Sequence, residues 1–275
     1  MTIAETILGW LSLPPERAQS YSTTTNMEKP AANPLHLLEH EYPDLAQLLK
    51  DKAVLDFGCG FGNQVAALAN SNKYSCRRVH GLDAHPDYVE AARRAHPGVT
   101  FIQQVDEVGY DVVISQDAME HYPDPAGALR AMRDAVQPGG LLLITFGPPW
   151  YAPYGSHMHF FCKVPWLNLL FSEKTIMKVR KRYRQDGAER FDQVESGLNK
   201  MSLAKFEGLI RASGLEIVRR RYGAFKRLDF LSRIPLLREL CVIRATVVLR
   251  RPRWDWDWWS AKFEKTSQAR EAALG

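Results

Sequence analysis

Val54-Leu55-Asp56-Phe57-Gly58-Cys59-Gly60-Phe61-Gly62 joins a short apolar segment to three alternating glycines. Residues 53–57 are apolar apart from one acid, and helix-forming residues resume at Gln64, so the pattern predicts a strand, a tight turn and a helix. Glycine permits positive φ and the close approach of a ligand, and the first N–H groups of a helix can donate to that ligand. The segment therefore predicts a binding turn for a nucleotide-like ligand.

The spacing within this turn discriminates between ligands. A dinucleotide-binding turn requires a small residue at position 63, where this chain has Asn63, so pyrophosphate binding is disfavoured. The segment resembles the acid-x-Gly-x-Gly-x-Gly motif of class I S-adenosylmethionine-dependent methyltransferases. The resemblance implies that S-adenosylmethionine is the cofactor, that Asp56 helps to hold its methionine amino group, and that the glycines lie beneath it.

A second acid ends the next expected strand, over residues 78–83. Asp83 lies 21 residues beyond Gly62, close to the offset of about 20 residues at which such folds place a ribose-binding carboxylate. We therefore expect Asp83 to bind the ribose hydroxyls. The full set of cofactor-binding residues that the resemblance implies is Asp56, Phe57, Gly58, Cys59, Gly60, Gly62, Asp83, Ala84, Asp106 and Gln116.

Asp106 departs from the family pattern. Members of the family carry an acid just after the third strand, where it contacts the adenine amino group. Counting from Phe101 puts Val105 at that position, and Asp106 follows one residue later. Asp106 is therefore either the adenine contact or an ordinary surface acid, and Gln104 is the alternative contact.

Strand and helix patterns alternate as far as residue 146. Further strands are expected over 99–105, 110–115 and 141–146, with helices beginning at Pro86 and after the Asp124-Pro125 pair. Glu-His at 120–121 and Pro-Gly-Gly at 138–140 also resemble later motifs of the methyltransferase type 11 group. The expected fold is α/β, a doubly wound, Rossmann-like sheet of seven strands whose last strand is antiparallel.

The chain divides into three expected parts. Residues 1–36 form an N-terminal helical lid, in which Leu8, Trp10, Leu11 and Leu13 need cover. Residues 37–251 form the methyltransferase domain, and its segment 147–201, rich in proline and aromatic residues, is a substrate-binding insertion. A helix over 202–213 and strands over 215–222 and 242–251 complete the domain. Residues 252–275 form a Trp-rich tail that we expect to dock on the body of the protein.

Composition indicates a soluble protein with a sizeable core. The chain has 275 residues, of which 45% are hydrophobic, and no run approaches the roughly 18 consecutive apolar residues of a membrane span. The N-terminus lacks the pattern of a secretory leader, so we expect a cytoplasmic protein. The four scattered cysteines argue against zinc and disulfides, and no metal site is predicted. Composition leaves the oligomeric state open.

The net charge of +5 arises partly from two basic runs, over residues 178–184 and 219–227. Neither run contains a nucleic-acid-binding motif, and the first is followed by Asp186 and Glu189. We interpret both as solvated faces. An acidic substrate, an anionic lipid surface and RNA are the alternatives, so nucleic acid is a possible partner that is not favoured.

Three histidines are the candidates for a catalytic base, namely His121, His157 and His159. Imidazole titrates near neutrality, and all three lie in segments expected at the ligand-binding edge of the sheet. The alternative is structural: the His-x-His pair bonds loop carbonyls, and His121 caps the helix that follows.

These patterns favour a methyltransferase that acts on a small molecule. Oxygen acceptors are slightly favoured over nitrogen or carbon because histidines are available as bases. An RNA or other macromolecule methyltransferase is the first alternative. A methyltransferase-like binding protein without catalytic activity is the second, because a retained binding site does not establish chemistry.

Overall fold

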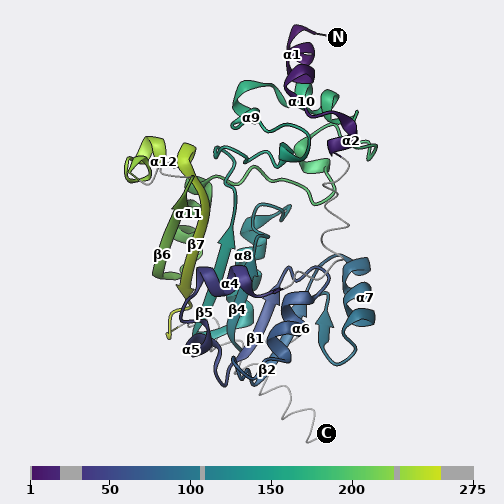
Figure 1. The fold of residues 1–275 in the computed structure, drawn as a ribbon. Coiled ribbons are helices and arrows are strands. Elements are labelled where there is room, and N and C mark those ends of the chain that lie inside the picture. Colours follow the sequence, from purple (N-terminus) through teal and green to yellow (C-terminus); the bar gives the residue numbers. More distant parts are fainter. Residues whose placement is uncertain (1, 19–32, 106–108, 226–229, 255–275) are drawn as a thin grey trace, which may run out of the picture.

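The protein is described here from a computed structural model that covers residues 2–18, 33–105, 109–225 and 230–254. Seven strands form one sheet in the order β3-β2-β1-β4-β5-β7-β6 (Figure 1). The strands are β1 (Ala53–Phe57), β2 (Arg78–Leu82), β3 (Thr100–Ile102), β4 (Tyr110–Gln116), β5 (Val136–Phe146), β6 (Glu216–Ala224) and β7 (Val242–Arg250).

The direction of the strands confirms the expected fold class. The pairs formed among β1 to β5 are parallel, whereas β7 runs antiparallel to both β5 and β6. The third strand is shorter than expected, because the exposed residues Gln103 and Gln104 leave the sheet after Ile102. The strand expected over 141–146 extends back to Val136.

Helices cover both faces of the sheet. One face packs against α8 (Pro125–Ala135) and α11 (Leu203–Ala212), through side chains such as Leu129 and Phe206. The other face packs against α4 (His36–Glu41), α5 (Leu45–Leu49), α6 (Asn63–Ala69) and α7 (Pro86–Ala95). Neighbouring residues of one strand, such as Val54 and Leu55, enter opposite cores, as alternation along a strand requires.

The expected helix starts are confirmed by their caps. The side chain of Asp124 accepts a hydrogen bond from Gly127 N, and that of Ser202 accepts one from Lys205 N. Pro86 lies in the first turn of α7, where its missing N–H costs no hydrogen bond. Gly214, at a φ of +69°, follows α11.

The insertion over 147–201 forms a separate layer at one end of the sheet (Figure 1). It contains η1 (Met158–Phe160), α9 (Leu167–Leu170), α10 (Glu173–Arg180) and η2 (Phe191–Gln193). The N-terminal α1 (Ile3–Leu11) and α2 (Pro15–Ala18) pack on this insertion, where Leu8 joins Phe161, Ile176 and Val179 in a core of their own. The described chain ends beyond η3 (Leu231–Arg233), α12 (Pro235–Cys241) and β7.

Burial in α1 differs from the expectation that its apolar residues need cover. Leu8 is fully buried, but Trp10 is 82% exposed and Leu11 is 46% exposed. The expectation is wrong for these two residues, because only one face of α1 meets α10. Most of the Trp-rich tail, residues 255–275, lies outside the described residues, and Trp254 is exposed.

Candidate cofactor and acceptor site

The glycine turn lies where the carboxyl ends of β1 and β2 meet. Gly58, Gly60 and Gly62 have φ values of 84°, 53° and 76°, in the left-handed region that favours glycine. Gly60 N donates to Asp83 Oδ2 at 2.9 Å, and His85 N donates to Asp83 Oδ1 at 2.9 Å. The parallel pairing of β1 with β2 thus brings the turn and the second acid together and fixes the Asp83 carboxylate.

Asp56 is a buried acid beside this turn. Its Oδ2 accepts a hydrogen bond from Gln64 Nε2 at 3.0 Å. Burial and the nearby charge of Asp83 raise the pKa of Asp56 to about 7. A carboxyl group held in this way gains from a cationic partner, because an ammonium group restores the ionised form. Asp56 therefore fits the amino group of S-adenosylmethionine.

Tyr122 lies against the same turn. Its hydroxyl donates to Phe57 O at 2.8 Å and is 3.0 Å from Ser115 Oγ. A Cβ on Gly58 would lie 2.6 Å from Tyr122 Oη, so a side chain there would displace the tyrosine. Sequence reasoning missed both Tyr122 and Ser115. Tyr122 directly follows the Glu120-His121 pair after β4, and this position could have identified it from the sequence.

The remaining expected cofactor residues fall at the same edge of the sheet, with one exception. Gln116 ends β4, and its Oε1 is buried without a partner among the described residues, which leaves an acceptor for a ligand N–H or O–H group. Cys59 and Ala84 follow β1 and β2. Asp106 lies outside the described residues, and its alternative, Gln104, is exposed.

Glu120 is a buried acid that sequence reasoning did not include in the site. Its Oε1 accepts from Gly147 N at 3.1 Å, whereas Oε2 is buried and has no partner among the described residues. Burial and the charge of Asp117 raise the pKa of Glu120 to about 8. Asp117 itself, at a φ of 48°, accepts from Arg244 Nη1 at 2.7 Å. Glu120 is therefore protonated at neutral pH.

Two of the three candidate histidines lie together. The ring centroids of His121 and His157 are 5.3 Å apart. His121 Nδ1 lies 2.7 Å from Gly197 O and, because a carbonyl oxygen only accepts, this nitrogen carries the proton. Burial lowers the pKa of His121, and lowers that of His157 to about 3, so both rings are neutral at pH 7. His159 is exposed, and its ring neighbours Tyr154.

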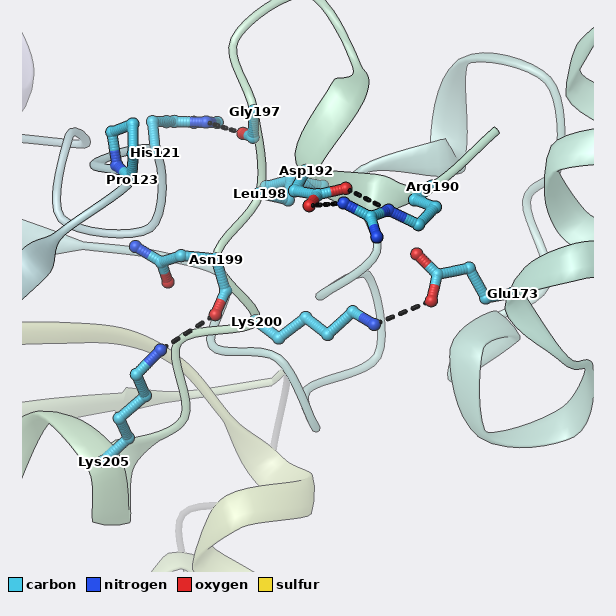
Figure 2. Close-up of a pocket in the computed structure, with 10 residues that line it drawn as sticks. All are labelled: His121, Pro123, Glu173, Arg190, Asp192, Gly197, Leu198, Asn199, Lys200 and Lys205. Carbon is cyan, nitrogen blue, oxygen red and sulfur yellow. Dashed lines mark hydrogen bonds and ion pairs between the residues drawn. The ribbon is translucent and has the colours of Figure 1, made fainter. Parts of the chain in front are cut away.

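A cavity of about 610 Å³ is lined by residues of the loop after β4 on one side and of the insertion on the other (Figure 2). Charged groups dominate its wall: Lys200 Nζ pairs with Glu173 at 2.8 Å, and Arg190 pairs with Asp192 at 2.6 Å. The residues that line it are His121, Pro123, Glu173, Arg190, Asp192, Gly197, Leu198, Asn199, Lys200 and Lys205.

Asn199 fixes one wall of this cavity to the sheet. Its Nδ2 donates to Met119 O at 2.7 Å and to Tyr122 O at 2.8 Å, and its backbone N donates to Glu120 O at 3.0 Å. The insertion is therefore attached to the loop that carries Glu120, His121 and Tyr122. The cavity and the glycine turn share this loop as a common wall.

The fold and the glycine turn together define a class I S-adenosylmethionine-dependent methyltransferase. A family model described as a methyltransferase domain matches residues 31–220, and the chain belongs to this family. The cofactor of the family is S-adenosylmethionine, and the arrangement of Asp56 and Asp83 beside the glycine turn fits it.

Curated relatives match a smaller part of the chain. The ubiquinone biosynthesis O-methyltransferase of Serratia proteamaculans is 38% identical over 101 residues, which are 33% of this chain and 40% of the relative. The enzyme of the same name from a Shewanella species is 32% identical over 127 residues, which are 41% of this chain and 52% of the relative. The chain thus spans about half of these relatives or less.

Solved structures share the fold at low sequence identity. A chain in the complex that contains the Haloferax volcanii Trm112 methyltransferase activator is 17% identical, with a TM-score of 0.50, over 79% of this chain and 90% of that chain. The [4+2]-cyclase SpnF is 15% identical, with a TM-score of 0.50, over 79% of this chain and 80% of that chain. At such identities the likeness establishes the fold alone.

The described ranges contain neither a membrane-spanning helix nor a cluster of metal-ligating side chains. No helix there is both long and apolar enough to cross a membrane. No group of three or more His, Cys, Asp or Glu residues in those ranges is arranged to hold a metal ion.

Proposed function

We propose that this protein transfers a methyl group from S-adenosylmethionine to an oxygen atom of a small molecule bound in the 610 Å³ cavity. The relatives named ubiquinone biosynthesis O-methyltransferase support an oxygen acceptor. The observation that carries the proposal is the position of His121, which lines the cavity and directly precedes Tyr122, whose hydroxyl contacts the glycine turn.

The cofactor supplies an electrophilic methyl group on a positively charged sulfur. Asp56 would hold the methionine amino group of this cofactor and Asp83 its ribose hydroxyls. Gln116, at the end of β4 on the other side of β1 from Asp83, offers a further acceptor. The insertion covers the loop after β4 and limits the entry of water. Such a site accelerates transfer by holding the reactants in position and excluding water.

His121 is the proposed base for the acceptor hydroxyl. The hydrogen bond to Gly197 O places the proton on Nδ1, so Nε2 carries the lone pair. Because burial lowers the pKa of His121, the ring is unprotonated at neutral pH and available to accept a proton. The pKa of about 3 makes His157 a poorer base, and we assign it to packing against His121.

Ion pairing within the basic runs does not favour the RNA alternative. Arg180 pairs with Asp186, and Lys181 pairs with Glu189. In the second run Arg219, Arg220 and Arg221 pair with Asp44, Glu207 and Glu41. Cations engaged in this way offer less charge to a phosphate backbone.

A paired substitution tests the proposal. Radiolabelled S-adenosylmethionine and a panel of phenols report transfer by His121→Gln and by His159→Gln, while calorimetry reports cofactor affinity. We expect the rate of His121→Gln to fall by about 10² or more with cofactor affinity unchanged, and His159→Gln to keep the wild-type rate. Equal rates for His121→Gln and the wild type would remove His121 as the base. Cofactor binding without transfer to any phenol would favour the binding-protein alternative.

A further inference from the structure

Helix α1 presents an apolar face that no described part of the protein covers. Ile3 and Trp10 are each 82% exposed, and Ile7 and Leu11 are 43% and 46% exposed. Along the chain these four residues follow one another at intervals of four, three and one residues, which places them on one side of the helix. The opposite side, with Leu8 and Glu5, is buried. A helix that is apolar on both sides is unusual at a surface in contact only with water.

This exposed face belongs to a firmly held helix. Thr2 and Glu5 form a capping box at its start. Lys178 Nζ pairs with Glu5 at 3.0 Å, and Leu13 N donates to Phe161 O at 2.6 Å just after the helix. The insertion therefore holds α1 through the side of the helix opposite to Ile3 and Trp10, which stay exposed. Figure 1 shows α1 at one end of the molecule.

Positive charge flanks the same helix. Residues 163–184 contain seven lysines and arginines and a single acid, Glu173. Two of the cations, Arg180 and Lys181, pair with Asp186 and Glu189, which leaves five outside these two ion pairs. Lys178 contacts Glu5 of α1, and the guanidinium of Arg182 lies beside Gly9. An apolar stripe with a Trp, bordered by cations, matches the boundary between headgroups and acyl chains of an anionic bilayer. RNA would not require the apolar stripe.

We propose that α1 lies flat on an anionic lipid surface, with Ile3, Ile7 and Trp10 inserted below the headgroups and the exposed side chains of Lys178 and Arg182 near the lipid phosphates. α10 extends from this contact to Glu173 in the wall of the cavity, and its eight residues span about 12 Å. The lipid surface thus lies one helix away from the proposed acceptor site. Binding to lipid does not depend on the proposed function.

Flotation of the full chain with vesicles tests this contact in the absence of cofactor and acceptor. The vesicles contain phosphatidylcholine alone, or equal parts of phosphatidylcholine and phosphatidylglycerol. We expect binding to the anionic vesicles only, weakened by salt. Ile3→Ser/Trp10→Ser should weaken partitioning by at least about tenfold, because two large apolar side chains no longer insert.

A matched control uses Trp254, a second highly exposed tryptophan among the described residues. Trp254 is 88% exposed and follows β7 at the opposite edge of the sheet, so Trp254→Ser should bind like the wild type. Unchanged thermal unfolding of all variants shows that they fold. Failure of the wild type to bind, or equal binding by Ile3→Ser/Trp10→Ser, overturns the proposal. If the wild type self-associates and Ile3→Ser/Trp10→Ser does not, the exposed face of α1 binds a second copy of the chain, and the proposal is overturned as well.

Discussion

At the scale of single residues, burial of acids sets the pH response of the site. Asp56 has a pKa raised to about 7, so near neutrality a large fraction carries no charge before a ligand arrives. Deprotonation creates the charge that attracts the methionine ammonium, which itself stays protonated below about pH 7.7. Cofactor binding and ionisation of Asp56 are therefore linked.

We expect the dissociation constant for S-adenosylmethionine to fall by about tenfold as the pH rises from about 5.5 to about 7.5. Calorimetry at several pH values measures it. Asp56→Asn should bind more weakly and lose most of this pH dependence, because the amide does not ionise. If the dissociation constant of Asp56→Asn changes with pH in parallel with that of the wild type, Asp56 is not the group whose ionisation is linked to cofactor binding.

Glu120 should make the folded protein less stable at higher pH. Its pKa in the folded state, about 8, lies above the ordinary glutamate value of 4.5, so the stability present below about pH 4.5 is lost as the pH rises to about 8. Relative to Glu120→Gln, the wild type should lose on the order of 1 kcal/mol per pH unit in this window. Urea unfolding measures the difference.

The exposed Glu189 provides the control. Glu189→Gln changes the same functional group at the surface. Because the hydrogen bond from Lys181 lowers the pKa of Glu189, this group stays ionised between about pH 5 and about pH 8, so the variant should differ from the wild type by the same amount throughout this range. The raised pKa of Glu120 is contradicted if Glu120→Gln does not become more stable relative to the wild type as the pH rises from about 5 to about 8.

At the scale of elements, the insertion is joined to the sheet through Asn199. Asn199→Ala removes donors to Met119 O and Tyr122 O, two carbonyls of the loop after β4. We expect a loss of about 1–3 kcal/mol in unfolding free energy and faster hydrogen exchange over residues 117–122. Asn168→Ala, which removes a bond to Trp150 O inside the insertion, should leave the exchange of that loop unchanged.

Local sequence patterns predicted most helices and strands, but they did not predict the contacts between segments that are far apart in the chain. A few neighbouring residues encode each of the features that were predicted, so the local sequence was enough to locate them. Examples are the glycine turn, the cap at Ser202 and the strand that precedes Asp83. The contact of His121 with Gly197 and the bonds of Asn199 join segments about 80 residues apart, and periodicity carries no information on such pairs. The exposed Trp10 was mispredicted because hydrophobicity alone does not say which face meets the protein.

At the scale of the whole molecule, an ionic network around the buried Glu41 connects α4 with β6, β7 and the loop after β4. Glu41, at the end of α4, accepts from Arg221 of β6 and from Thr246 of β7. Arg244 of β7 lies near Glu41 and pairs with Asp117 after β4. Although burial opposes ionisation, these hydrogen bonds lower the pKa of Glu41.

Glu41→Gln should destabilise the protein by about 1–3 kcal/mol, because it leaves the arginines without their buried partner. The stabilisation by Glu41 is present above the unfolded pKa and is lost as the pH falls through the lower folded value. Urea unfolding near pH 7 measures the effect. Asp192→Asn, which breaks an exposed ion pair with Arg190, should change stability by less than about 1 kcal/mol. Equal effects of the two substitutions would show that the Glu41 network contributes no more than a surface pair.

The position of β7 has a consequence for synthesis on the ribosome. This strand is made after the other six strands of the described sheet, yet it lies between β5 and β6. Until residue 250 has emerged, a nascent chain exposes the backbone of β5 as an open edge that can pair with other chains. The cofactor-binding half, β1 to β4, can assemble earlier. Completion of the sheet must therefore wait for the synthesis of residues 242–250.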